Sequence, residues 1–470
     1  MMLSAWLARG RAWVQAREAS FFVYLAATVG AAGVTFYTIK FVIAFLTRAQ
    51  YGVWGYYAAL SAMLLPVASL SLPQAMMRMY FDRDAADGAG QASLVTTTLL
   101  LNLGGAAALA AAAGALFLFG GRNALLLAYV GTVSTGAVVL SFCNYLARVR
   151  NDYGLYAFNK LFETATFALV AAWAGSTLAA GAGAGAAAAG GLAGTLGVAA
   201  DRLLFLTRAY AAVLWTVNAV NLAWFASRGV VSARARLLPR AEVRALLAFS
   251  IPLSGTYFLG WTLASSDIWL LKRFSTLDET ADYVFAVGVA SVVSLVTQSA
   301  LVDWPRFYYA RMRDGGPARD SAIAQRVELF LWLHVAAILG VRVVARFAYE
   351  LLGAHAYAAG LEYVRYLLLG DFFFLCGNLF AAGIGYAKRT QLNLVTFAVP
   401  GALNVGLNLF LVPRWGARAA ALTTLGAYAC FALVSFAIGQ RYYKFTRRGR
   451  LLAAAAGATA AALVPLGLGV

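Results

Sequence analysis

Several charged side chains of this 470-residue sequence lie inside long apolar stretches, and they are the groups best placed to do chemistry. A charge in the hydrocarbon core of a bilayer costs at least about 2.5 kcal/mol unless it faces a cavity or a partner, so each is a candidate functional residue. Carboxylates at this depth can bind H⁺ or Na⁺ and couple an ion gradient to transport. The ion-coupling candidates are Glu163, Asp267 and Asp371.

Basic side chains in similar stretches have a different use, because they neutralise phosphates and acidic sugars. For three of them a structural role is an alternative. Lys160 lies one helical turn from Glu163 and would pair with it, while Arg78 and Arg306 would anchor helix ends by reaching lipid phosphates. The candidates for a cationic substrate-binding group are Lys40, Arg78, Lys160, Arg306 and Arg342.

Other polar residues in these stretches also have structural interpretations. His334 suits either a packed, hydrogen-bonded histidine or a proton carrier. Asn404 and Asn408 share one helix face and are expected to bond neighbouring helices. Asp267 could brace the outer end of its helix against a residue of another helix.

The composition explains why these positions lie in a membrane. Hydrophobic residues make up 62% of the chain and charged residues only 12%, with a mean hydropathy of +0.74, which is too apolar for a soluble globular protein. The sequence predicts an all-α polytopic membrane protein with about 12 transmembrane helices. We expect them near residues 20–46, 51–79, 91–119, 123–147, 153–174, 203–225, 246–274, 282–306, 324–351, 361–387, 391–412 and 416–440.

The formal net charge of +18 does not indicate a nucleic-acid partner, because the basic residues concentrate at the N-terminus, in alternate loops and in the tail. This is the pattern of cytoplasmic segments facing anionic lipids. We therefore expect a multi-pass protein of the cytoplasmic (inner) membrane with a cytoplasmic N-terminus. Its expected parts are an N-terminal bundle (1–227), a basic cytoplasmic linker (228–245), a C-terminal bundle (246–440), and a basic tail with a hydrophobic segment (441–470).

The stretch Tyr51–Phe81 differs from an ordinary membrane helix, because Pro66 and Pro73 interrupt it and Arg78 stands near its end. Such interruptions suit a helix that lines a cavity or bends during a working cycle. A weaker copy occurs at Asp282–Tyr309, again with a proline and an arginine near an aromatic end. The pair indicates an internally duplicated chain.

Two segments do not fit a count of 12 and leave 13 or 14 helices as alternatives. The Gly/Ala-rich tract 179–200 precedes the expected sixth helix, and we interpret it as an external or partly inserted loop. Residues 451–470 are about long enough for a thirteenth crossing, but they could equally lie in the interface.

Three blocks of the sequence resemble Wzx-type polysaccharide transporters, the lipid-linked oligosaccharide flippases of the MATE-like MOP exporter superfamily. Residues 45–81 are similar to that family's YG turn and second helix with its Pro-x-x-x-x-Arg element. Residues 246–274 resemble its seventh helix, and 387–424 its Asn-rich eleventh helix, Pro-Arg-aromatic-Gly turn and twelfth helix. Arg418 and the Gly/Ala tract depart from the family pattern.

The resemblance implies two pseudo-symmetric six-helix bundles around a central cavity that opens alternately to either side. It implies a flippase that moves a polyprenyl-pyrophosphate-linked oligosaccharide from the inner to the outer leaflet for O-antigen, capsule or exopolysaccharide biosynthesis. The implied partners are the lipid-linked oligosaccharide, a polysaccharide polymerase and a chain-length regulator.

Other functions are alternatives. A multidrug or small-molecule cation-coupled antiporter would share the fold, although the excess of cationic over acidic candidates disfavours it. A membrane enzyme of polysaccharide assembly, such as a polymerase or glycosyltransferase, would need a sizeable catalytic loop, and the loops here are short. A lipid II flippase would have an adjacent Arg-Asp pair in its first helix, and residues 20–46 contain none.

The sequence indicates neither an enzyme nor a resident cofactor. No phosphate-binding Gly-rich loop is present, so the chain is not expected to be an ATPase. Three cysteines, Cys143, Cys376 and Cys430, lie far apart in apolar runs without metal-binding or disulfide spacing. H⁺ or Na⁺ coupling is the only cofactor-like requirement we expect.

Overall fold

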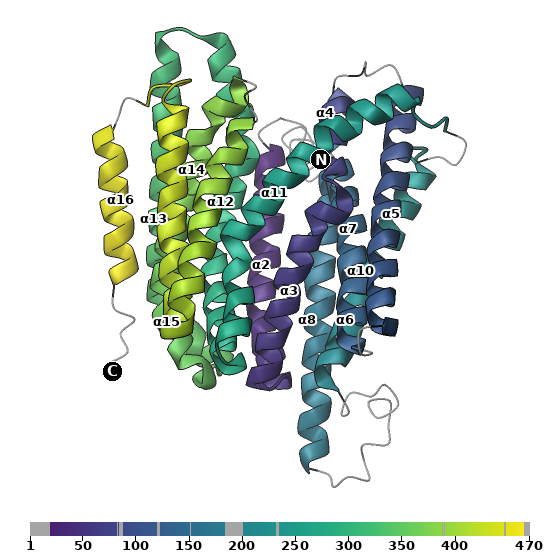
Figure 1. Ribbon diagram of the computed structural model, residues 1–470, viewed down its shortest axis with the longest axis vertical. Coiled ribbons are helices and arrows are strands. Elements are labelled where there is room, and N and C mark those ends of the chain that lie inside the picture. The colour runs from purple at the N-terminus through teal and green to yellow at the C-terminus, as the bar shows by residue number, and fades with distance from the viewer. Residues whose placement is uncertain are drawn as a thin grey trace, which may run out of the picture. The chain divides into compact units, whose positions relative to one another are not determined.

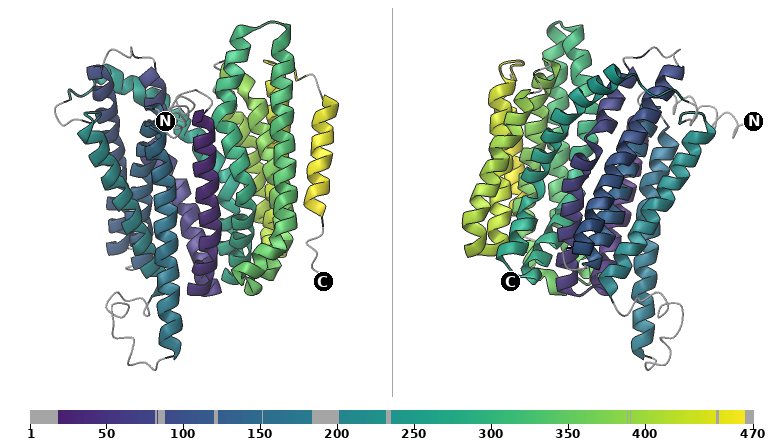
Figure 2. Two further views of the ribbon diagram at one scale, coloured as in Figure 1. Left: turned by 180° about the vertical axis from the view of Figure 1, so that it is seen from behind. Right: turned by 45° about the vertical axis from the view of Figure 1, so that its right-hand side comes forward.

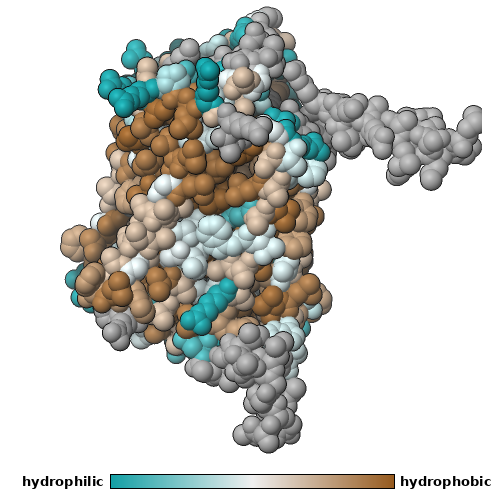
Figure 3. Space-filling model, turned by 90° about the vertical axis from the view of Figure 1, so that its right-hand side faces the viewer, coloured by the Kyte–Doolittle hydropathy of each residue, from teal (hydrophilic) through white to brown (hydrophobic). Residues whose placement is uncertain are grey.

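The computed structural model describes residues 19–81, 83, 88–119, 123–150, 152–183, 201–231, 235–387, 389, 391–445 and 448–464. Nearly all of these residues are helical and none forms a strand, which confirms the all-α prediction. Within this part of the chain, eight helices are long and apolar enough to cross a membrane, or up to nine if a bent pair forms one span. Hydrophobic residues cover most of the face in Figure 3, and hydrophilic ones gather towards its upper and lower ends.

The chain divides into two compact units. Unit 1 comprises Met1–Phe45 and Leu60–Phe258, and unit 2 comprises Leu46–Ala59 and Leu259–Val470. Two long helices, α3 (Arg48–Ser69) and α11 (Arg240–Phe274), therefore contribute one part to each unit.

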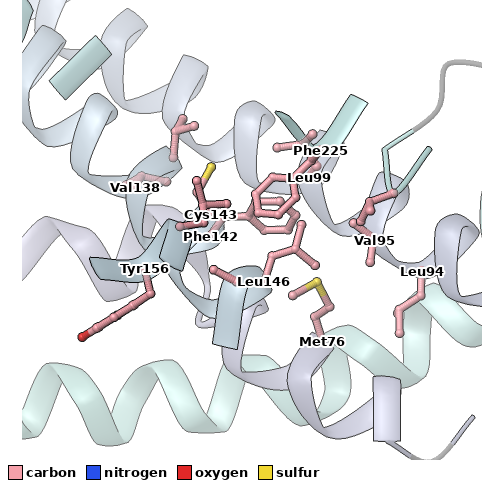
Figure 4. Packing of buried hydrophobic residues seen from close by; sticks show 14 of the residues in the cluster. Met76, Leu94, Val95, Leu99, Val138, Phe142, Cys143, Leu146, Tyr156 and Phe225 are labelled. Carbon is pink, nitrogen blue, oxygen red and sulfur yellow. The ribbon is translucent and has the colours of Figure 1, made fainter. Parts of the chain in front are cut away.

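Most of the remaining helices of unit 1 pack around an apolar core. Side chains from α4, α5, α7 and α10 meet in it, including Met76, Leu99, Phe142 and Phe225, all at most 5% exposed (Figure 4). The helices are α2 (Ala19–Phe45), α4 (Leu72–Phe81), α5 (Gly88–Phe119), α6 (Ala124–Ala128), a π-helical turn (Tyr129–Ser134), α7 (Thr135–Val149), α8 (Tyr153–Gly183) and α10 (Arg202–Ser227).

Two of these helices can be compared with the positions that the sequence predicted for the fifth and sixth helices. α10 agrees with the sixth helix expected at 203–225. α8 continues past the expected end at residue 174 to Gly183, so it extends beyond its neighbours in unit 1 (Figure 2). The first residues of the Gly/Ala tract are therefore helical, and residues 184–200 lie outside the described residues.

In unit 2, α14 packs against both α12 and α15, and α13 lies between α12 and α16 (Figure 1). The expected eleventh and twelfth helices join in α15, with a change of direction at Gly416, whose φ of 52° and ψ of −134° are not helical. The helices are α12 (Leu277–Asp314), α13 (Pro317–Leu352), a 3₁₀ turn (His355–Tyr357), α14 (Ala358–Tyr386), α15 (Gln391–Gly439) and α16 (Arg448–Leu463).

The first part of α3 is attached to α12 within unit 2. Arg48 forms an ion pair with the buried carboxylate of Asp282. Gly52 and Gly55 allow the helices to approach closely, because a Cβ would collide with the Leu277 carbonyl at the first position and with the Val284 side chain at the second.

The interruption expected in Tyr51–Phe81 is present as a complete break. α3 ends at Ser69 and α4 begins at Leu72, with a bend of 48° between them. Leu70 and Ser71 adopt left-handed conformations, with φ of 47° and 50°, which are strained for residues other than glycine. The related stretch in α12 is one continuous helix that contains Pro305.

Candidate functional site

Asp371 lies at the centre of a buried polar cluster in unit 2. The α14 carboxylate is 8% exposed, and it accepts hydrogen bonds from Ser294 Oγ and Thr297 Oγ1, each at 3.0 Å. Ser294 and Thr297 are three residues apart on α12 and therefore share the face directed at α14. His334 of α13 is fully buried, with Nε2 3.5 Å from Asp371 Oδ2.

The hydrogen bonds fix what this cluster can do with a proton. Since the Thr297 hydroxyl donates to Asp371, its oxygen is left to accept the Nδ1–H of His334, 3.3 Å away. A neutral imidazole in that tautomer directs the lone pair of Nε2 at the carboxylate, and Nε2 has no hydrogen-bond partner. One added proton would convert this repulsion into an attraction, so the pair is suited to bind a single H⁺.

Asp267 forms a separate network in unit 2. This α11 carboxylate is 1% exposed and accepts hydrogen bonds from Tyr283 of α12 and, at 2.9 Å, from Thr424 of α15. Its other oxygen accepts the backbone N–H of Ile268 at 2.8 Å. The residue thus joins three helices, as the expectation of a partner on another helix required.

Two asparagines extend the polar contacts between α11 and α15. Asn408 donates to Asn404, whose own amide donates to the Leu263 carbonyl of α11 at 2.9 Å. Thr423 donates to Asn408 at 2.6 Å. These bonds confirm that the asparagines share a face and link neighbouring helices.

Glu163, the third ion-coupling candidate, belongs to unit 1 and has a different environment. It is partly exposed on α8 and accepts a hydrogen bond from Tyr210 of α10 at 3.0 Å. Among the ion pairs of the described residues, none joins Glu163 to Lys160, so the intrahelical pair given as an alternative for these residues does not form. Lys160 and Lys40 are both partly exposed, on α8 and α2.

The predicted arginines have distinct surroundings. Arg78 is exposed on α4, with its guanidinium 4.8 Å from the ring centre of Phe249 on α11. Arg342 on α13 is 5% exposed and donates from Nε to the Val464 carbonyl after α16, at 3.0 Å. Arg306 follows Pro305 on α12, and its side chain lies outside the described part of the structure.

Solved structures are similar to this chain over almost its whole length. One is the inward-facing conformation of a multidrug resistance MATE family transporter of the MOP superfamily, with a TM-score of 0.62, 14% identity, and coverage of 93% of this chain and 95% of that one. The fold is that of a MATE-like transporter. Another similar structure is the outward-facing conformation of a multidrug resistance MATE family transporter of the MOP superfamily. Its TM-score is 0.55 at 14% identity, over 93% of this chain and 96% of that one.

A third similar structure belongs to a MOP superfamily transporter from Pyrococcus furiosus, described as having a binding pocket of reverse polarity that suggests a different function. Its TM-score is 0.58 at 12% identity, over 90% of this chain and 95% of that one. No protein-family model matches the sequence, and no curated protein matches it either. The MATE-like fold agrees with the superfamily that the sequence resembles, and membership of the Wzx-type group stays a prediction.

Arg148 was not among the residues that the sequence predicted to bind substrate. Its guanidinium lies over two tyrosine rings, 4.7 Å from the ring centre of Tyr145 on α7 and 5.2 Å from that of Tyr156 on α8. Its Nε is buried without a hydrogen-bond partner. Tyr257 of α11 lies beside Arg148, Tyr145 and Gln74 of α4, and Gln74 Oε1 also has no partner.

Arg148 and Arg78 are therefore the basic residues of unit 1 that we consider for substrate binding, rather than Lys40 and Lys160. Gln74 and Arg78 are four residues apart on α4 and share a face, so the two arginines border the same polar and aromatic cluster. The spacing of Tyr145 and Arg148 was a signal for part of this arrangement. The contacts from α8 and α11 depend on which helices are neighbours, which the sequence pattern does not give.

Proposed function

We propose that this protein is a flippase for a polyprenyl-pyrophosphate-linked oligosaccharide in the inner membrane, with its N-terminus in the cytoplasm. The observation that supports this most is the way unit 1 holds Arg78 and Arg148. Aromatic rings orient both guanidinium groups, and no carboxylate among the described residues forms an ion pair with either. Their N–H donors remain available for an anion, and a guanidinium matches phosphate oxygens in charge and geometry.

The acidic residues of unit 1 strengthen this argument, because those that the structure describes have other partners. Asp152 accepts from the Trp224 indole, Glu163 from Tyr210, and Asp201 from the backbone at the start of α10. Glu242 pairs with Arg83. An aromatic-lined basic group whose described carboxylate neighbours are bonded to other groups favours an anionic head group over a cationic drug.

The Asp371–His334 pair would supply the energetic coupling. Binding of one proton between these residues changes the charge in the core of unit 2, and a MATE-like transporter needs such a change to link an ion gradient to its conformational cycle. Asp267 is the second coupling candidate, because its carboxylate is also buried and already accepts three hydrogen bonds.

The multidrug antiporter is the alternative that a specific observation favours. Asp267 and Asp371 are buried carboxylates that could attract an organic cation, and the first structural neighbour is described as a multidrug resistance transporter. In this alternative the arginines of unit 1 would only anchor helix ends at lipid phosphates. As a flippase, the protein would instead be expected to work with a polysaccharide polymerase and a chain-length regulator.

Binding measurements on the purified full chain distinguish the two functions. We expect Arg78→Gln and Arg148→Gln each to weaken binding of undecaprenyl-pyrophosphate-linked oligosaccharide by about tenfold, because each removes a charge-assisted hydrogen bond. Arg450→Gln is the control, since Arg450 pairs with Glu328 through a 2.6 Å contact. Unchanged glycolipid binding in both variants, together with ethidium transport that requires Asp371, would instead establish the antiporter.

A further inference from the structure

The break between α3 and α4 leaves buried oxygen atoms of unit 1 without donors. Pro73 has no N–H, so the Ser69 carbonyl cannot receive the hydrogen bond it would have in a continuous helix. Ser71 is fully buried, and its Oγ has no hydrogen-bond partner. The only local side-chain bond at the break among these residues runs from Ser71 N to Ser69 Oγ, at 3.3 Å.

A buried amide from α5 lies at the same level. Asn102 is fully buried, and neither Oδ1 nor Nδ2 has a hydrogen-bond partner. Gly105 packs against the Ala68 carbonyl so closely that a Cβ would collide with it, while Leu101 contacts the cluster around Leu72. α5 therefore runs antiparallel to α3 and α4 here, with Gly105 beside Ala68 and Leu101 beside the Leu72 cluster. This arrangement places Asn102 opposite the break.

Unpartnered polar groups in this position need an explanation. A buried polar atom without a hydrogen bond destabilises the fold, and two consecutive left-handed residues add backbone strain. The unpartnered atoms and the strained backbone occur together at the break between α3 and α4. The close approach of Gly105 to Ala68 holds α5 beside this break. The donor Asn102 Nδ2 also lacks a partner, while the carbonyl end of α3 adds acceptors with negative partial charge.

We propose that the break between α3 and α4 binds one alkali cation, Na⁺ or K⁺, through neutral oxygens. The ligands are Asn102 Oδ1, Ser71 Oγ and the carbonyls of Ala68 and Ser69. A cation interacts with all four at once, whereas a water molecule donates only two hydrogen bonds. Unwound backbone at the carbonyl end of a half-helix is suited to this task inside a membrane protein.

The first test is cation-dependent thermal stability of the purified full chain in lipid nanodiscs, with choline replacing Na⁺ or K⁺ at constant ionic strength. We expect a saturable rise in Tm with Na⁺ or K⁺, and at least about tenfold weaker cation affinity in Ser71→Ala. Ser435→Ala is the matched control, because Ser435 is also a fully buried serine without a hydroxyl partner, and it should retain the shift. No shift with either cation in the wild type would overturn the site and leave ordered water as the occupant.

Further variants locate the site. Asn102→Leu removes the amide ligand, but this variant could fail to fold. Asn102→Asp adds a charged oxygen ligand without changing size, so it should raise the affinity for Na⁺ by about tenfold. The double variant Asp267→Asn with Asp371→Asn should retain the Na⁺ shift. If it loses the shift while Ser71→Ala retains it, the cation binds in unit 2 and the proposal is wrong.

Na⁺ should also slow amide hydrogen exchange at residues 70–76. Unchanged exchange there would contradict the proposed cation site.

Discussion

Units 1 and 2 both bury polar side chains between helices, but they use different chemistry. In unit 1, Asn159 of α8 donates to Asn144 of α7 at 2.9 Å, and it exchanges hydrogen bonds with Asn221 of α10 at 2.7 and 3.0 Å. Unit 2 also has a buried amide pair, Asn404 and Asn408, but it adds the carboxylates of Asp267 and Asp371, each surrounded by hydroxyl donors.

The difference teaches what each network can do. Amides do not titrate, so their bonds link α7, α8 and α10 in the same way at any pH. A buried carboxylate can gain a proton or a cation, and its hydroxyl neighbours must then reorient. We therefore interpret the amide network as permanent helix–helix contact, and the carboxylate networks as parts of unit 2 that respond to ions.

The largest effect should come from removing the charge that responds. Asp371→Asn keeps the size of the side chain, but it leaves one acceptor oxygen in place of two and cannot take up a proton, so we expect at least a tenfold loss of proton-driven transport in proteoliposomes. His334→Gln should shift the pH dependence of transport while leaving the protein folded. The control is Asp320→Asn in the first turn of α13, whose carboxylate contacts only Arg319 among the described ion pairs.

The same variant can contradict the proposed difference between the two units. If Asp371→Asn transports at the wild-type rate with the wild-type pH profile, the carboxylate is a structural group like the amides of unit 1. The two units would then differ in composition alone.

A smaller effect, on stability, is expected from the amide network. Asn159→Leu leaves the amides of Asn144 and Asn221 without this partner, which should cost about 1–3 kcal/mol of unfolding free energy. Transport per folded molecule should be unchanged at every pH. Thr164→Val on the same helix is the control, because its hydroxyl bonds only to the backbone of α8.

Thermal or denaturant unfolding in detergent measures the first quantity, and transport normalised to folded protein measures the second. A pH-dependent transport defect in Asn159→Leu would contradict the interpretation of this network as permanent contact.

The smallest effect should follow from removing one donor around Asp267. Thr424→Val is nearly isosteric and deletes one of three hydrogen bonds to that carboxylate, so we expect a loss of about 1 kcal/mol in unfolding free energy. Thr396→Val is the matched control, because Thr396 is also buried on α15 but donates to the Asn393 carbonyl of its own helix. Equal losses in the two variants would show that Thr424 contributes nothing specific to Asp267.

The sequence predicted much of the fold, since composition and hydropathy alone indicate which stretches enter a membrane. The helices found at Ala19–Phe45 and Arg202–Ser227 lie within a few residues of their expected positions. Pro73 predicted the interrupted second helix, because proline cannot supply the N–H that a helix interior needs. Pro66, by contrast, lies inside α3 without ending it. The extension of α8 to Gly183 was not predicted, because glycine lowers helix propensity and its sequence pattern favours a loop.

The candidate site was only partly predictable. Burial in an apolar stretch identified Asp267 and Asp371 as notable, but not their partners. Thr297 and Asp371 are 74 residues apart, and the hydrogen bond between them depends on α12 and α14 being neighbours. Arg342 lies in an apolar stretch as expected for a buried cation, yet its observed partner is the Val464 carbonyl.

The sequence by itself determined that this is a helical membrane protein, where most of its helices run, and which charged residues enter the apolar layer. The reason is that the cost of placing polar groups in lipid depends on local composition and is visible in any window of the chain. Only the tertiary structure decided that His334 faces Asp371, and that tyrosines surround Arg148. Helix faces meet through contacts between distant segments, and those contacts determine the chemistry of each buried charge.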